Sequence, residues 1–132
     1  MKRSLDAFII EDDEADAFFA RRTLDRSGLL GRVTIFQYAR KALEALNHNS
    51  VPAPDLIMVD LNMPGMNGTE FARRLAEDMP EIRANLQIWM LTSSIDPRDI
   101  AQALNDCGVD RVVPKNTPEQ TIISYLKSFP GL

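Results

Sequence analysis

Five polar side chains in this sequence follow short apolar runs and could together transfer a phosphoryl group. Glu11 and Asp12 follow the first run, and Asp60 ends another. Thr92 and Lys115 lie at the ends of two later runs. The Asp60 carboxylate is a candidate nucleophile toward phosphorus. The Lys115 ammonium and the Thr92 hydroxyl could each hold one oxygen of the transferred group and neutralise its charge.

The three carboxylates predict a bound divalent cation. Like charges that meet raise one another's pKa values, so three acids at one place are costly without a counter-ion. Oxygen ligands with no His or Cys among them favour a hard ion, and Mg²⁺ fits best because it takes a few carboxylates and keeps several waters. We therefore predict Mg²⁺ beside Glu11, Asp12 and Asp60, where it would hold a third phosphoryl oxygen.

Each of these residues also has a purely structural interpretation. Acids at 11–13 could oppose the dipole of the helix that follows them. Asp60 could be a turn acid, Thr92 a strand residue with a satisfied hydroxyl, and Lys115 a solvated surface lysine. The functional interpretation is favoured because all of these side chains fall where a strand ends.

Buried parallel strands would position these side chains. Within residues 55–60, an apolar run at 56–59 is too short for a free-standing helix; it ends at Asp60, and a Pro/Gly/Asn loop follows. This pattern is typical of a strand that is covered on both faces. Shorter or alternating apolar runs predict four more strands, at residues 7–10, 33–38, 86–91 and 109–113.

A helix is predicted after each strand from apolar positions at helical spacing. Gly28 should end the first helix, and an Asn67/Glu70 capping box should begin the third. Met79-Pro80 should end the third helix. Asp96-Pro97 and Thr117-Pro118 should begin the fourth and fifth, and Gly108 should end the fourth. The positions predicted to face the core are Phe19, Ala20, Thr23 and Leu24; Ala39, Ala42, Leu43 and Leu46; Phe71 and Leu75; Ile100, Ala103, Leu104 and Cys107; and Ile122, Leu126 and Phe129.

Strict alternation of strands and helices predicts an α/β fold: a doubly wound, five-stranded parallel sheet with helices on both faces. The length of 132 residues predicts one domain over residues 1–132. Ligands bind at the carboxyl ends of the strands in such sheets. The five polar side chains should therefore meet along one edge.

Composition excludes several classes of partner. The net charge is −4 and no run of Lys or Arg forms a basic face, so we expect no nucleic acid. No apolar stretch is long enough to span a membrane, and the basic start at residues 1–3 is no signal peptide. Cys107 is the only cysteine, which excludes a disulfide framework and suits a cytoplasmic protein. Trp89 is expected in the core and His48 in solvent.

These motifs resemble the receiver domains of two-component response regulators. The resemblance rests on the acidic pair at 11–12, Asp60 with the loop at 61–68, Thr92-Ser93, and Lys115. It implies a flavodoxin-like (βα)5 fold with strand order 2-1-3-4-5. It also implies reversible phosphorylation of Asp60 by a histidine kinase or a histidine phosphotransfer protein, with Mg²⁺ as cofactor.

By the same resemblance, Asp12 and Asp60 would ligate Mg²⁺ directly, Asn62 through its backbone carbonyl, and Glu11 through water. Glu11 and Asp12 are taken as the acidic pair because Glu11 directly follows the apolar run, which leaves Asp13 as the cap of the first helix.

Two positions depart from the family pattern. Asn116 follows Lys115, where the family usually has a proline in a cis bond, and here Pro114 precedes the lysine. Val112 stands where the family commonly has an aromatic ring that turns inward on activation. The switch surface around Val112 and Ser93 must therefore report phosphorylation without a ring at 112.

Two functions of different classes remain open. The first is a phosphorelay switch that acts on a downstream protein or passes the phosphoryl group onward. The second is a receiver-like binding module that acts without phosphorylation. A turnover enzyme is disfavoured, because acids replace the phosphate loop of a flavodoxin after the first strand, and Asn62 replaces the second acid of a haloacid-dehalogenase-type phosphatase. We expect no output domain, and the sequence leaves open whether the chain forms a homodimer.

Overall fold

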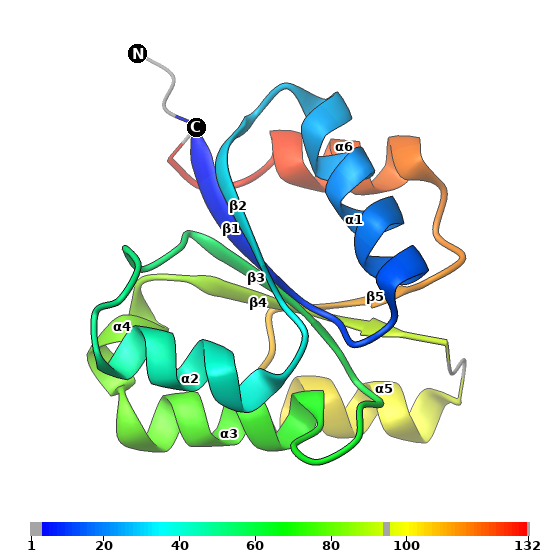
Figure 1. The fold of residues 1–132 in the computed structure, drawn as a ribbon. Helices are drawn as coiled ribbons and strands as arrows, with labels where there is room; N and C mark the ends of the chain where they lie inside the picture. The colour runs from blue at the N-terminus through cyan, green and yellow to red at the C-terminus, as the bar shows by residue number, and fades with distance from the viewer. Residues whose placement is uncertain (1–3, 94–95, 132) are drawn as a thin grey trace.

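The structure, a computed structural model, describes residues 4–93 and 96–131, and its central feature is a parallel sheet (Figure 1). In the described residues this sheet has five strands in the order β2-β1-β3-β4-β5, and each neighbouring pair is parallel. The predicted doubly wound fold and the strand order implied by the family resemblance are both confirmed. The strands are β1 (Leu5–Ile10), β2 (Leu30–Phe36), β3 (Leu56–Asp60), β4 (Gln87–Thr92) and β5 (Arg111–Pro114).

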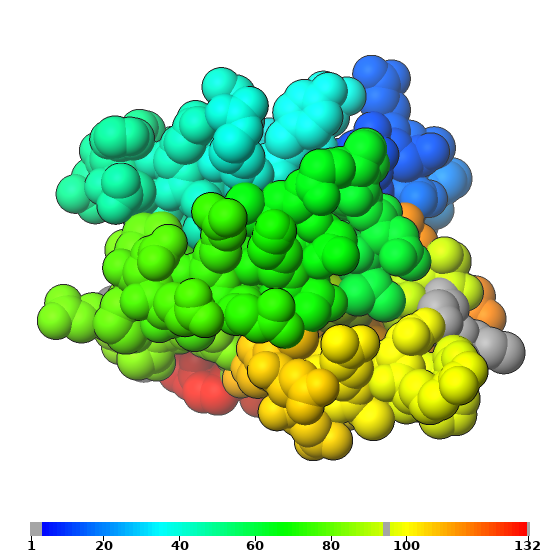
Figure 2. Space-filling view, turned by 90° about the horizontal axis from the view of Figure 1, so that it is seen from below, coloured from blue at the N-terminus to red at the C-terminus, as the bar shows by residue number. Residues whose placement is uncertain are grey.

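Helices cover both faces of the sheet. In Figure 1, α1 and α6 lie on one face, and α2, α3 and α5 lie on the other. Figure 2 views the second layer from outside, with α3 between α2 and α5. The helices are α1 (Glu14–Ser27), α2 (Ala39–Asn47), α3 (Gly68–Asp78), α4 (Pro80–Ala84), α5 (Pro97–Asn105) and α6 (Glu119–Lys127).

The side chains of the central strand β3 pack into two hydrophobic cores, one on each face of the sheet. All five of its residues are buried, and successive side chains enter opposite layers. Ile57 and Val59 pack with residues of α2, α3 and α5, whereas Leu56 and Met58 pack with residues of α1 and α6. The continuous apolar run therefore has the predicted cause, since both faces of the strand are covered.

The described chain contains one helix more than predicted. Met79-Pro80 does end α3, but Pro80 is also the first residue of the short helix α4. Proline is well suited to the first helical position, where its missing N–H would have no helical partner. Arg83 fixes α4 to the next turn by donating to the carbonyl oxygens of Leu86 and Gly108.

Several predicted boundaries were wrong. β2 begins at Leu30 because Leu30 pairs with Leu5, and it ends at Phe36 instead of continuing to residue 38. β4 begins at Gln87, one residue later than predicted. β5 is Arg111–Pro114 rather than residues 109–113. The Val109 N–H instead donates to the Ala103 carbonyl at 3.3 Å, in the turn that leaves α5.

Several helix ends were predicted correctly from a glycine or from a capping side chain. Gly28 ends α1 with φ of +72°, and Asn67 and Asp96 accept backbone N–H bonds at the starts of α3 and α5. α5 ends at Asn105, before Gly108. The predicted cap at Thr117 was wrong, because α6 begins after Pro118 without a side-chain cap and the Thr117 N–H closes a turn onto the Pro114 carbonyl.

Two residues predicted to face the core are exposed. Phe19 is 51% exposed and Leu104 is 40% exposed. The Arg22 guanidinium lies 5.0 Å from the centre of the Phe19 ring, so this ring packs against a neighbouring side chain on the outside of α1. The other predicted core positions are buried or half-buried, Trp89 and Cys107 are buried, and His48 is exposed, as predicted.

The described helices include none that is long and apolar enough to cross a membrane.

Candidate functional site

The parallel register brings the ends of β1, β3 and β4 to one edge. Ile10 pairs with Val59, so Glu11 and Asp60 follow these paired residues on neighbouring strands. Asp60, the last residue of β3, pairs with Leu91, and Thr92 ends β4 one residue later. Glu11 and Asp60 are only 2% and 4% exposed. Two acids are therefore buried side by side at the carboxyl edge of the sheet.

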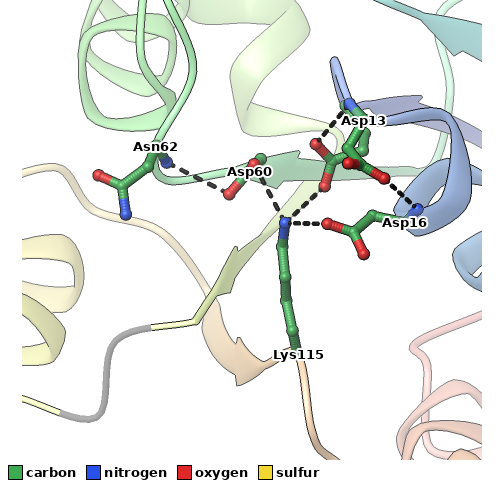
Figure 3. Close-up of polar contacts among 6 residues, drawn as sticks. Asp13, Asp16, Asp60, Asn62 and Lys115 are labelled. Carbon is green, nitrogen blue, oxygen red and sulfur yellow. Dashed lines mark hydrogen bonds and ion pairs between the residues drawn. The ribbon is translucent and has the colours of Figure 1, made fainter.

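Lys115 reaches this edge from the loop after β5 (Figure 3). Its Nζ lies 2.7 Å from Asp16 Oδ2, 2.8 Å from Glu11 Oε1 and 3.2 Å from Asp60 Oδ2. Its backbone N–H also donates to the Thr92 carbonyl at 2.7 Å, which ties the start of the loop to the end of β4. One ammonium thus donates to three carboxylates, which lie after β1, in α1 and at the end of β3.

The charges in this cluster shift one another's protonation. Burial raises the pKa of Glu11 to about 7, because the charged form loses solvation; hydrogen bonds from Lys115 and the Asp13 N–H oppose this, and the Asp60 charge adds to it. Burial alone would lower the pKa of the Lys115 ammonium, but hydrogen bonds to Asp16 and Glu11 outweigh it, and the pKa is raised. The lysine therefore stays charged at neutral pH, while the pocket still carries excess negative charge.

The acidic side chains are arranged to fit a hard cation. One carboxylate oxygen from each of Glu11, Asp12 and Asp60 lies within 4.8 Å of the other two. Carboxylate oxygens are the ligands that Mg²⁺ and Ca²⁺ prefer. The raised pKa of Glu11 agrees with this, since burial disfavours the charged carboxylate and the hydrogen bond from Lys115 only partly offsets it. The residues present fit a divalent cation in both chemistry and spacing.

Asp13 lies at the start of α1, outside this group. Its Oδ1 accepts the Asp16 N–H at 2.9 Å, so it is the N-cap that was predicted. Its own N–H donates to Glu11 Oε2 at 3.2 Å. The choice of Glu11 and Asp12 as the paired acids agrees with this placement.

Sequence reasoning missed Asp16, which makes the shortest of the three bonds to Lys115. A signal for it was present. Ala20 and Thr23 were predicted to face inward, and Asp16 lies four and seven residues before them, on the same side of a helix. The inward stripe of α1 thus ends in an acid at the edge of the sheet.

Asn62 and Thr92 occupy the flanks of the pocket. The Asn62 N–H donates to Asp60 Oδ1 at 3.2 Å, and Figure 3 shows its side chain directed away from Asp60. Thr92 is 1% exposed. Ser93 is exposed directly after it. Any role of these residues toward a bound group remains a prediction.

The loop after β3 closes tightly behind Asp60. The Gly68 N–H donates to the Leu61 carbonyl at 3.2 Å. A Cβ placed on Gly68 would lie 2.6 Å from the Asp60 carbonyl oxygen and 2.7 Å from Met90 Sδ. Only glycine leaves room for this approach of the backbone, so Gly68 helps to set the position of the Asp60 backbone.

The two departures from the family pattern have simple local structures. The described peptide bonds include no cis bond, so Lys115 and Asn116 are joined in trans. Val112 is half-buried and packs against the core formed with α2, α3 and α5. Whether Val112 and Ser93 form a switch surface remains a prediction.

The fold and the site place this chain in the class of parallel α/β domains with a polar site at the carboxyl edge of the sheet, where ligands of such sheets bind. Within this class, the chain belongs to the response regulator receiver domain family, whose family model matches residues 7–127. The resemblance drawn from the sequence motifs is thereby confirmed.

Individual relatives agree with this assignment. The response regulator protein VraR of Staphylococcus aureus is 39% identical over 74 residues, which are 56% of this chain and 33% of that protein. The match thus spans a third of the length of these curated relatives. A two-component response regulator from Cytophaga hutchinsonii is similar with a TM-score of 0.84 and 25% identity, over 96% of this chain and 98% of that one. The phosphorylated cyanobacterial phytochrome response regulator RcpA has the same fold, with a TM-score of 0.77 and 23% identity, over 95% and 90% of the two chains.

Proposed function

We propose that this chain is a phosphorelay switch that accepts a phosphoryl group on Asp60. The observation that carries the proposal is the position of the Lys115 ammonium, 3.2 Å from Asp60 Oδ2 and 2.8 Å from Glu11 Oε1. It lies beside the acidic cluster of Glu11, Asp12 and Asp60, in which one oxygen of each acid lies within 4.8 Å of the others. Nucleophile, cation ligands and a fixed positive charge are the parts that phosphoryl transfer to a carboxylate requires.

In the proposed reaction, an Asp60 carboxylate oxygen forms a bond to phosphorus, and the bond from phosphorus to the donor breaks. The donor would be a phosphorylated histidine of a histidine kinase or a histidine phosphotransfer protein, which leaves with the bonding electron pair. Lys115 would donate to one phosphoryl oxygen and the Thr92 hydroxyl to another. Attack of water on phosphorus would return the carboxylate and release inorganic phosphate.

Mg²⁺ is the proposed cofactor, and when bound it supplies charge neutralisation at the phosphoryl oxygens. Asp12 and Asp60 would hold it directly, Asn62 through its backbone carbonyl, and Glu11 through water. The charge balance of the buried acids supports this assignment. Glu11 and Asp60 share one lysine, and a cation would relieve the charge that the lysine leaves uncompensated.

The remaining parts of the proposal concern the context of the domain. We infer a cytoplasmic receiver domain over residues 1–132 that acts through a downstream protein rather than by turnover of a substrate. The absence of a ring at Val112 leaves the alternative of a receiver-like module that binds its partner without phosphorylation. One experiment separates the two.

The test is to incubate the protein with Mg²⁺ and acetyl phosphate and to measure its intact mass. We expect one phosphoryl adduct, lost in Asp60→Asn and in samples without Mg²⁺. Asp78→Asn is the matched control, because it removes one exposed carboxylate at the end of α3 and should keep the adduct. If wild-type protein forms no adduct at saturating Mg²⁺, the switch is excluded and the binding module is favoured.

A further inference from the structure

We propose that Asp16 is a positioning residue that holds the Lys115 ammonium toward α1 and competes for it with the phosphoryl group on Asp60. The inference rests on the function proposed above. Asp16 Oδ2 lies 2.7 Å from Lys115 Nζ, closer than the 3.2 Å between Nζ and Asp60 Oδ2. In the unphosphorylated protein, the lysine is therefore bonded more closely to the helix than to the phosphate acceptor.

All donors of the lysine are engaged in this arrangement. An ammonium group has three N–H donors, and Lys115 meets three carboxylates, those of Asp16, Glu11 and Asp60. A phosphoryl oxygen can gain a bond from Lys115 only if one of these contacts is given up. The contact to Asp60, at 3.2 Å the longest of the three, would be given up first, while the bond to Asp16 still holds the ammonium toward α1 and limits its approach to the phosphoryl group.

Asp16 also differs from the other two acids in its relation to a cation. The acidic cluster consists of Glu11, Asp12 and Asp60 and does not include Asp16. A cation that draws on Glu11 and Asp60 therefore leaves Asp16 as the carboxylate committed to Lys115. Figure 3 shows Asp16 and Asp60 on different sides of the ammonium, so the two acids pull it in different directions.

The position of Asp16 is set by the start of α1. Its N–H is held by the N-cap Asp13 at 2.9 Å. Further along the helix, Thr23 and Arg26 donate to Glu119 at the start of α6 at 3.1 and 3.0 Å. These contacts join α1 to α6, so the helix that carries Asp16 is fixed to its neighbour in the same layer.

A purely structural ion pair would behave differently in experiments. The Asp16 side chain is 41% exposed and that of Lys115 is 24% exposed, and pairs with this exposure contribute little to stability. Loss of such a structural pair would loosen the pocket and lower the affinity for every ligand. If Asp16 competes for the lysine, its removal should lower the affinity for a cation and raise the affinity for an anion.

The expected signs follow from charge. In Asp16→Asn, one negative charge is lost and Lys115 moves toward Asp60, and both changes oppose Mg²⁺. We expect Mg²⁺ to bind about 2- to 5-fold more weakly, the factor that corresponds to a partly exposed ion pair. Beryllofluoride, an anionic analogue of a phosphoryl group, should bind about 2- to 5-fold more tightly at saturating Mg²⁺, because the ammonium is free to face it.

The experiment measures Mg²⁺ affinity by calorimetry and beryllofluoride affinity by fluorine NMR on the 132-residue protein. Asp16→Ala is a second variant that removes both the charge and the acceptor, and it should show the same two signs. Glu14→Gln is the matched control, since Glu14 is an exposed acid in the same turn of α1, and both affinities should change by less than in Asp16→Asn. Two affinities that both weaken, or that do not differ from the control, overturn the inference.

A further readout separates this inference from the proposed function. In metal-free wild-type protein, the Lys115 ammonium should give a slowly exchanging NMR signal that shifts in Asp16→Asn but not in Glu14→Gln. If the wild-type protein forms no adduct with acetyl phosphate but the NMR signal shifts in Asp16→Asn, the proposed function is refuted and the ion pair between Asp16 and Lys115 is supported. A normal adduct with no shift and no opposite changes in affinity would refute the role of Asp16 alone.

Discussion

The Lys115 ammonium lies 2.8 Å from Glu11 Oε1, although 104 positions separate the two residues in the chain. The Glu11 side chain is fully buried and that of Lys115 is 24% exposed, so the pair is largely shielded from solvent. The contact joins the end of β1 to the loop after β5, past the ends of β3 and β4. Changes to this contact should therefore alter both the stability of the fold and the proposed chemistry of the site.

Replacing Lys115 with Gln should destabilise the metal-free protein at pH 8. The change leaves the buried carboxylates of Glu11 and Asp60 without their positive partner, which costs about 1–3 kcal/mol for groups of this kind. The loss should shrink toward pH 5, where the Glu11 carboxyl, whose pKa is raised to about 7, takes up a proton. Urea unfolding followed by Trp89 fluorescence measures it, with the exposed Lys127→Gln as control. An equal loss at both pH values would contradict the charge argument.

The raised pKa of Glu11 predicts how stability varies with pH in metal-free protein. The pKa rises from 4.5 in the unfolded chain to about 7 in the folded one, so the folded state binds this proton more tightly. Stability from this group is complete below pH 4.5 and is lost as the pH rises to about 7, by at most about 3 kcal/mol.

Glu11→Gln should remove most of this slope and stabilise the metal-free protein at pH 8. The measurement is thermal unfolding from pH 4.5 to pH 8 in the presence of a chelator. Mg²⁺ should raise the melting temperature of the wild type more than that of Glu11→Gln, since a ligand of the folded state stabilises it by mass action. A wild-type stability that rises with pH over this range would show that Lys115 outweighs burial at Glu11.

Gly68→Ala should disturb the site through the backbone of Asp60. The added Cβ meets the Asp60 carbonyl oxygen at 2.6 Å, and such overpacking costs about 1–3 kcal/mol. Gly65→Ala is the matched comparison, because nothing lies within 4 Å there and its cost is the strain of a φ of +77°, about 1–2 kcal/mol. Both variants should lose stability in urea, but only Gly68→Ala should also weaken Mg²⁺ binding at temperatures where both are folded. Equal Mg²⁺ affinities would show that the loop yields without moving Asp60.

Asp13→Ala should lower stability by about 1 kcal/mol, because the Asp16 N–H at the start of α1 loses its side-chain acceptor. Asp13→Asn keeps an acceptor oxygen and should cost less. Unfolding in urea at pH 7 measures the difference. An Asn variant as unstable as the Ala variant would mean that the charge of Asp13, rather than its hydrogen bond, supports the helix.

Local patterns in the sequence were sufficient for most of the fold. The buried strand ending at Asp60, the glycine stop at Gly28, and the caps at Asp13, Asn67 and Asp96 each depend on residues close in the chain. Hydrophobic period and capping chemistry act over a few residues, so they can be read without knowing what lies across the domain. The same patterns also brought Glu11, Asp60 and Lys115 to one edge, because parallel strands align their carboxyl ends.

Tertiary structure alone decided which side chains bond within that edge. Asp16 and Lys115 are 99 residues apart, and their contact depends on how α1 crosses the sheet. The exposure of Phe19 and Leu104 also depends on packing, since helical spacing gives the width of an apolar stripe but not how far a neighbouring layer covers it. The number and order of the strands along the chain, most of the caps and the acid at the end of β3 could be predicted, because they follow from short-range chemistry; the bounds of β2, β4 and β5 could not. The angle and coverage of the helices come from the packing of the whole domain.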